Sequence, residues 1–138
     1  MADSLKNPVF SPEDVIRFPA GIPGFEQNKE FVIVRLPEYL PFEWLVAADG
    51  SGLRFAIVNP MAFRPDYAPN IIKEQLGDLK YDSPDDVLLY TIVTIRPNPA
   101  ESTVNLIGPV FINRARRIGK QIIIDDDRYS TRDTIFKG

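Results

Sequence analysis

The sequence predicts an all-β fold, a small antiparallel barrel-like single domain with one short helix. Three observations support this prediction. Thirteen prolines are scattered over 138 residues, about twice the usual share, and proline interrupts helices and central strands. Between the prolines, apolar residues recur mostly with the two-residue period of a strand. Only the stretch 70–77 has a helical pattern, so crossover helices for a parallel α/β sheet are lacking.

The predicted strands are short and are separated by turn residues. The run FVIVRL at 31–36 is almost continuously apolar, which is typical of a strand buried on both faces. Apolar residues alternate in 42–49 and again in 53–60, and the intervening ADGSG predicts a hairpin turn. The run at 86–96 is the longest and is predicted to be central. Segments 102–113 and 120–125 bring the total to about seven strands, as in a small barrel or sandwich.

The single predicted helix is NIIKEQLG at 70–77. Asn70 is a suitable N-cap, Ile71, Ile72 and Leu76 supply an apolar side, and Gly77 is suited to the left-handed position that ends a helix.

The composition favours a binding module over an enzyme. The chain has no cysteine and no histidine, so it cannot build a thiolate site, an imidazole metal site or a Ser-His-Asp set by itself. We therefore predict no catalytic residues and no cofactor. The net charge of −3 argues against direct nucleic-acid binding, and the absence of a long apolar run argues against membrane insertion. We expect a cytoplasmic protein.

The stretch FPAGIPGFE at 18–26 bends sharply between two aromatic residues. It lacks the pattern of a phosphate-binding loop, and no long helix follows it. We interpret Gly21, Pro23, Gly24 and Phe25 as a rigid structural turn, with Phe18 and Phe25 packed beneath it.

The stretch VNPMAFRPDY at 58–67 follows a predicted strand and permits two interpretations. Asn and Asp often bond the local backbone in turns, so a structural turn explains part of it. Phe63, Arg64 and Tyr67 are residue types that frequently anchor protein interfaces. A turn and a binding loop therefore remain alternatives.

The stretch INRARRIGKQ at 112–121 contains four cations and no acid. A solvated hairpin tip, a docking patch for an acidic partner, and a phosphate or RNA contact are all compatible with it. No aromatic residue lies between Phe111 and Tyr129, which disfavours nucleic acid. The nearby acids at 125–127 are expected to neutralise part of the patch, and they lack the spacing of a calcium loop. Asp85 and Asp86 are predicted to form a turn before the long strand.

Three blocks of this sequence together resemble the FliW family of flagellar assembly factors. They are FPAGIPGFE, FAIVNPMAFRPDY and STVNLIGPVFINRARRIGKQIII, and they occur in that order. The resemblance covers about 13–135 and indicates one FliW-like domain over 1–138. Met61 and Gly108 depart from the residues expected at those positions, an aromatic and an alanine.

The resemblance implies a regulator without enzymatic activity. FliW-like proteins are small barrel-like domains that bind flagellin monomer in the cytoplasm and, alternatively, the translational repressor CsrA. Binding of CsrA relieves its repression of flagellin translation, and accumulated flagellin competes for FliW. We expect a monomer that forms heteromeric complexes.

We expect partner contacts in the 59–67 loop and in the 105–113 region with its basic tip. Truncation of Phe63 and Tyr67 together is expected to weaken binding with little change in the thermal midpoint. The predicted contact residues are Asn59, Pro60, Phe63, Arg64, Asp66, Tyr67, Asn105, Ile112, Asn113, Arg116 and Arg117.

Two other classes of function are compatible with a small barrel. One is a cofactor-binding barrel, for example for flavin, in which Arg116 or Arg117 contacts a phosphate. The other is a barrel that binds single-stranded nucleic acid, whose affinity would fall steeply with salt.

Overall fold

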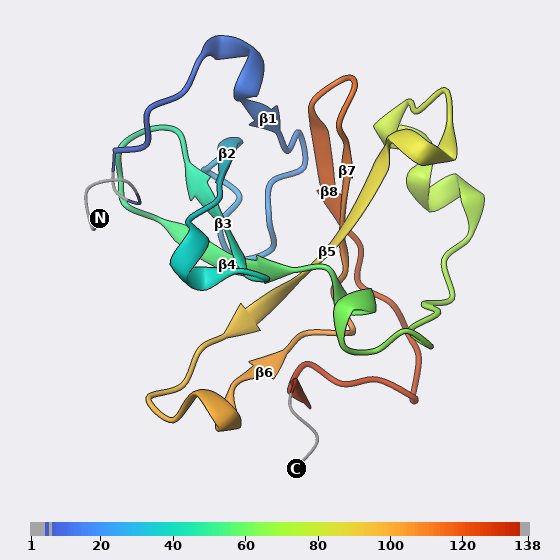
Figure 1. Ribbon diagram of the computed structural model, residues 1–138. Helices are drawn as coiled ribbons and strands as arrows, with labels where there is room; N and C mark the ends of the chain where they lie inside the picture. The colour runs from blue at the N-terminus through green and yellow to red at the C-terminus, as the bar shows by residue number, and fades with distance from the viewer. Residues whose placement is uncertain (1–4, 6, 136–138) are drawn as a thin grey trace.

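A computed structural model describes residue 5 and residues 7–135 and contains one sheet of nine strands. Seven strands close into a barrel in the order β4-β3-β2-β1-β8-β7-β5, because β5 also pairs with β4 (Figure 1). β6 and β9 extend the sheet beyond β5. This arrangement confirms the predicted all-β barrel. The strands are β1 Ile16–Arg17, β2 Glu30–Val34, β3 Glu43–Ala47, β4 Arg54–Val58, β5 Val87–Thr94, β6 Thr103–Val104, β7 Val110–Asn113, β8 Ile118–Gln121 and β9 Asp133–Thr134.

The pairing of the strands follows the predicted pattern with four differences. β5 is the longest strand and pairs with β4, β6 and β7, and β3 and β4 form the predicted hairpin. The segment 102–113 is two strands, because a turn at 105–109 separates β6 from β7. β8 begins two residues before the predicted 120–125 strand. β1 and β9 are two-residue strands that were not predicted, and β1 pairs with β8 in parallel.

The scattered prolines all lie outside the strands, and five of the thirteen begin short 3₁₀ turns. Five of these turns have proline in their first positions, where the missing N–H would have no partner within the turn. The prolines therefore set the connections rather than the strands. The turns are η1 Pro12–Asp14, η2 Pro37–Tyr39, η3 Pro60–Ala62, η4 Lys73–Leu79, η5 Pro84–Asp86 and η6 Pro99–Glu101.

The predicted helix at 70–77 is the 3₁₀ turn η4, which begins and ends later than predicted. Asn70 is not its cap, since the first helical residue is Lys73 and Ile72 precedes it. Gly77 lies inside the turn, and Lys80 takes the left-handed conformation at its C-terminal end, with φ of 54°. The side chain of Gln75 reaches back to accept a hydrogen bond from the N–H of Ile72 at 2.9 Å. This contact starts the helix at 73.

The inside of the barrel is filled by side chains from its strands. Phe18 and Phe31 meet edge to face at its centre, with ring centroids 5.4 Å apart, and both are fully buried. Ile16, Leu45 and Ile57 pack around them. The interior is therefore a hydrophobic core, as expected for a barrel of this size.

Connecting segments cover the outside of the barrel in two places. The stretch that contains η4 lies over the β7–β8 hairpin, where Leu79 packs against Phe111 and Ile118 (yellow-green beside orange in Figure 1). The loop after β4 packs against β5 and β6 through Phe63 and Tyr67. These two coverings carry most of the predicted contact residues.

Candidate partner-binding surface

The 59–67 loop is held in one conformation from its first residue. Asn59 follows β4, and its side-chain oxygen accepts a hydrogen bond from the N–H of Met61 at 2.9 Å, which caps η3. Pro60 is the first residue of η3 and is buried. Asn59 and Pro60 therefore have structural roles at the start of η3, and an Asn-Pro pair is typical of such a position.

Tyr67 ends the loop with its ring in the core. Only 5% of its surface is exposed, and its hydroxyl donates a hydrogen bond to the carbonyl of Leu106 at 2.7 Å. Burial raises the pKa of the Tyr67 hydroxyl, so it remains a donor. Truncation of Tyr67 must therefore lower stability, contrary to the expectation that the thermal midpoint would hardly change.

Tyr129 and Asp133 hold the loop from the opposite end of the chain, and neither was predicted. The rings of Tyr67 and Tyr129 meet edge to face, with centroids 4.8 Å apart, and the hydroxyl of Tyr129 accepts a hydrogen bond from the N–H of Ala68. Arg64 forms an ion pair with Asp133 at 3.6 Å and donates to the carbonyl of Thr134. No local sequence signal links these positions, since they are brought together by the β6–β9 pairing.

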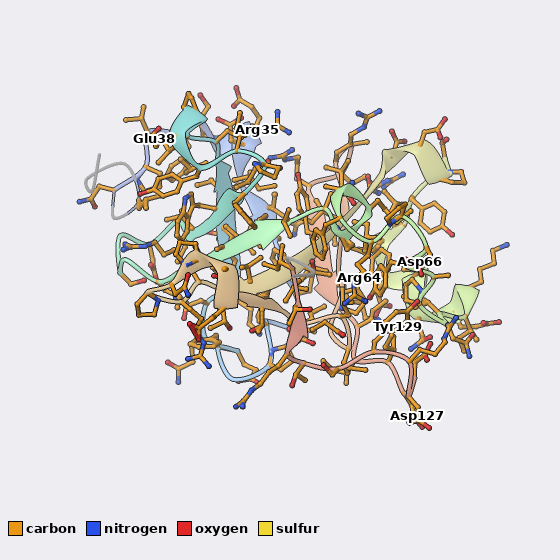
Figure 2. All side chains as sticks on the ribbon, turned by 60° about the horizontal axis from the view of Figure 1, so that its bottom comes forward. Arg35, Glu38, Arg64, Asp66, Asp127 and Tyr129 are labelled. Atoms are coloured by element: carbon orange, nitrogen blue, oxygen red, sulfur yellow. The ribbon has the colours of Figure 1, made fainter. Side chains whose placement is uncertain are left out.

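The exposed residues of the 59–67 loop are Asn59, Met61, Ala62, Pro65 and Asp66. Met61 is 42% exposed, Asp66 is exposed, and Phe63 is half-buried. Figure 2 shows Asp66 beside Arg64 and Tyr129, whereas Arg35 and Glu38 lie at the far edge of the molecule. The loop thus presents a mixed apolar and polar surface with one carboxylate, that of Asp66, on a rigid base.

Asn105 and its neighbours form a turn directly against the 59–67 loop. The side-chain oxygen of Asn105 accepts hydrogen bonds from the N–H groups of Ile107 and Gly108 at 3.0 and 2.9 Å. The adjacent Leu106 carbonyl is the acceptor for Tyr67. The structure therefore brings Asn105 and the 59–67 loop together.

Ile112 and Asn113 are buried and act within the fold. Ile112 belongs to the barrel core. The amide nitrogen of Asn113 donates to the carbonyl of Leu79 at 2.8 Å, and its oxygen accepts from the N–H groups of Ala115 and Arg116. Asn113 thus joins the hairpin tip to the η4 segment.

The basic hairpin tip is neutralised by the segment that precedes β5, and not by the acids at 125–127. The ion-pair distances are 3.7 Å for Arg114–Asp86, 3.7 Å for Arg116–Asp82 and 2.9 Å for Lys120–Asp78. Hydrogen bonding to Lys120 holds the pKa of Asp78 below its usual value. The three aspartates are spaced four residues apart in segment 78–86, which runs beside the hairpin.

Arg117 stabilises the conformation of the same hairpin tip. It adopts a left-handed conformation, with φ of 56°, and its guanidinium donates to the carbonyl of Asp14 at 2.7 Å. Arg117 thus has a partner within the fold, and Arg116 has one in Asp82. The hairpin tip lies near the top of the view in Figure 1, apart from the loop after β4.

The structural turn at 18–26 has the sharp geometry that its glycines predict. Gly21 has φ of 73°, and a Cβ there would lie 2.7 Å from the Cα of Glu26. Gly24 has φ of 89° and donates its N–H to the carboxylate of Glu26, which lowers the pKa of that carboxyl group. Phe18 packs beneath the turn as expected, whereas Phe25 is 42% exposed and meets Phe55 edge to face. Pro23 is exposed between the two glycines.

Two further findings concern metals and membranes. Within residues 5 and 7–135, no three carboxylates lie close enough together to hold a metal ion. None of the helices in this part of the chain has the length and apolarity needed to cross a bilayer.

The fold and these surfaces define a small closed β-barrel whose exposed candidate contacts lie in connecting loops outside a packed core. The family model described as FliW protein matches residues 4–135. The chain belongs to the FliW family of flagellar assembly factors.

Individual relatives agree with this assignment. The flagellar assembly factor FliW of Syntrophomonas wolfei is 41% identical over 93% of this chain and 82% of its own length. That of Moorella thermoacetica is 39% identical over 92% of this chain and 81% of its own length. A crystal structure of a flagellar assembly factor FliW superposes with a TM-score of 0.87 at 32% identity, covering 94% of this chain and 91% of that one.

Proposed function

We propose that this protein is a cytoplasmic regulator that binds flagellin monomer and, alternatively, the translational repressor CsrA. In the CsrA-bound state it relieves repression of flagellin translation, and in the flagellin-bound state it leaves CsrA free. The observation that carries the proposal is the membership of the chain in the FliW family over residues 4–135. Its contribution is binding, without catalysis or a cofactor.

The structure supports a binding role through the rigidity of the 59–67 loop. A hydrogen bond within the loop, a hydrogen bond to Leu106 and an ion pair with Asp133 hold this loop, so little conformational entropy remains to be lost when a partner binds. Met61 and Asp66 project from it. We propose that these two side chains contact a partner directly, while Asn59, Pro60, Arg64 and Tyr67 act by shaping the surface.

The second proposed contact region is the hairpin tip. Arg114 and Arg116 are exposed and their ion pairs with aspartates are 3.7 Å long, so a partner carboxylate can replace the aspartates at small cost. Ile112, Asn113 and Arg117 support this region from within, whereas Asn105 supports the turn beside the 59–67 loop. The hairpin tip lies at the top of Figure 1 and the loop after β4 lies well below it, so the protein has two separate candidate surfaces.

A cell-free translation assay tests the proposed function. A reporter that carries the flagellin messenger RNA leader is repressed with CsrA, and the purified chain is then added. We expect the reporter signal to recover with rising chain concentration and to fall again when flagellin monomer is added. If a large molar excess of folded chain leaves repression unchanged, the proposal is wrong. Reactions without CsrA control for direct effects on translation.

A further inference from the structure

A hollow of about 300 Å³ lies on the outside of the barrel, where β1 and β8 run side by side and the end of η4 approaches them. Its walls are mainly apolar and come from Pro19, Ala20, Leu79 and Ile118. β1 and β8 lie beside each other at the upper side of the barrel in Figure 1. None of the residues predicted from sequence as partner contacts lines this hollow.

The alternation of the two strands explains why the hollow is open and apolar. Ile16 points into the barrel core, so its neighbour Arg17 points outward, and Arg17 is the register partner of Ile118 across the parallel pair. Ile118 packs toward Leu79 of η4, whereas Gly119 faces the ring of Phe18 in the core and adds no side chain outside. The chain then leaves η4 at Lys80, before it covers the groove.

The charges at the rim of the hollow are unbalanced. Lys120 is already bound, because its ammonium donates to the carboxylate of Asp78 at 2.9 Å and to the carbonyl of Gln75 at 3.0 Å. Arg17 and Lys80 are exposed and form no ion pair with any residue that the structure describes. The rim therefore carries three cations and one carboxylate, an excess of two positive charges beside an apolar floor in a chain whose net charge is −3.

We propose that this hollow is a docking site for an acidic peptide segment of a partner protein, one that places an apolar side chain between two carboxylates. The apolar side chain fits against the exposed Pro19 and Ala20, above the buried Leu79 and Ile118, and the carboxylates lie next to Arg17 and Lys80. Single-stranded nucleic acid fits less well, because the hollow has no aromatic residue among its described lining residues to stack on a base. This site goes beyond the proposed function, since it does not depend on flagellin or CsrA.

The test is a titration of the isotope-labelled full chain followed by backbone amide NMR at low salt. The probe is the capped peptide acetyl-Gly-Glu-Leu-Glu-Gly-amide, and the matched control replaces both Glu residues with Gln. We expect saturable shifts centred on 17–20, 78–80 and 118–120. Affinity is expected to fall about threefold to tenfold for the Gln peptide, the range that two exposed ion pairs support, and to weaken as salt rises.

Two double variants separate the hollow from general charge effects. Arg17→Gln with Lys80→Gln removes the free cations, and we expect the same threefold to tenfold loss of affinity. Arg96→Gln with Arg132→Gln changes the net charge equally at positions outside the hollow, and we expect no loss. The amide spectrum of each variant reports whether it is folded.

Three results would overturn the proposal. One is the absence of saturable shifts at the hollow at millimolar peptide. Another is equal binding of the Glu and Gln peptides, or equal loss in both double variants. The third is tighter occupation of the same residues by a short poly-uridine RNA than by the peptide, which would make the hollow a nucleic-acid site. None of these results bears on flagellin or CsrA binding.

Discussion

The hydroxyl of Tyr67 donates a buried hydrogen bond of 2.7 Å to the carbonyl of Leu106, 39 residues further along the chain. This bond joins the 59–67 loop to the turn that separates β6 from β7. Since both segments belong to the proposed partner surface, the bond sets their relative position without itself being available to a partner.

Tyr67→Phe should lower the free energy of unfolding by about 1–2 kcal/mol, because it leaves the buried Leu106 carbonyl without its donor. Tyr67→Ala should cost about 3–5 kcal/mol, because it also creates a cavity beside Tyr129. Urea denaturation followed by fluorescence measures both changes. Tyr39→Phe, at an exposed tyrosine, is the control and should change stability by less than about 0.5 kcal/mol. A Tyr67→Phe variant as stable as the control would contradict the structural role.

Gly119→Ala should destabilise the barrel strongly. A Cβ at position 119 would clash with the buried Phe18 ring, so the ring or the strand must shift at a cost of about 1–3 kcal/mol. Gly77→Ala is the matched control, since a Cβ there meets nothing within 4 Å and alanine favours the helical turn. We expect Gly77→Ala to be neutral or stabilising by up to about 1 kcal/mol in the same denaturation experiment. Equal effects of the two substitutions would be inconsistent with this packing.

Asp78→Asn should make the stability of the protein less dependent on pH at the acidic end. Hydrogen bonding to Lys120 keeps the folded pKa of Asp78 below its ordinary value of 3.8, so the unfolded state binds more protons between these two values. The stabilisation is complete above the ordinary value and is lost as pH falls through the lower, folded value. Thermal midpoints measured from pH 6 down to pH 2 should therefore fall less in Asp78→Asn than in the parent chain. Asp85→Asn, at an exposed aspartate with no ion pair among the described residues, should follow the parent curve.

Met61→Ala combined with Asp66→Ala should weaken partner binding about tenfold or more, as expected when central contacts of an interface are truncated. Both side chains are exposed, so stability should change by less than about 1 kcal/mol. Calorimetric titration with flagellin and, separately, with CsrA measures the loss. Ile95→Ala combined with Glu38→Ala removes one exposed apolar and one exposed acidic side chain elsewhere and should bind normally. Unchanged affinity for both partners in the Met61 and Asp66 variant would remove this surface from the account.

The strand pattern was largely predictable because it depends on local alternation. The long strand β5 and the β3–β4 hairpin were predicted from apolar periodicity and turn residues. β1 and β9 were not, since two-residue strands are too short to show a period and exist only through pairing with distant segments. η4 begins at 73 because Gln75 bonds the N–H of Ile72, a competing cap that outweighs Asn70.

Residue type alone could not separate surface anchors from core. Tyr67 and Asn113 belong to types found both at interfaces and in buried hydrogen-bond networks, and here tertiary contacts from Leu106 and Leu79 bury them. Likewise, the cations of the hairpin tip pair with aspartates about 30 to 40 residues away in sequence, so the adjacent acids at 125–127 gave the wrong partner. These assignments depend on which segments the barrel brings side by side.

Alternate binding of the two partners is the central claim, and a calorimetric titration of the chain with flagellin monomer from the same organism tests it most directly. The titration is then repeated with the chain already saturated with CsrA. We predict saturable one-to-one binding of flagellin alone and a strongly reduced signal in the presence of CsrA. Flagellin binding that is unchanged by saturating CsrA would contradict alternate binding, and no binding by a folded sample would contradict the flagellin-sensing role itself.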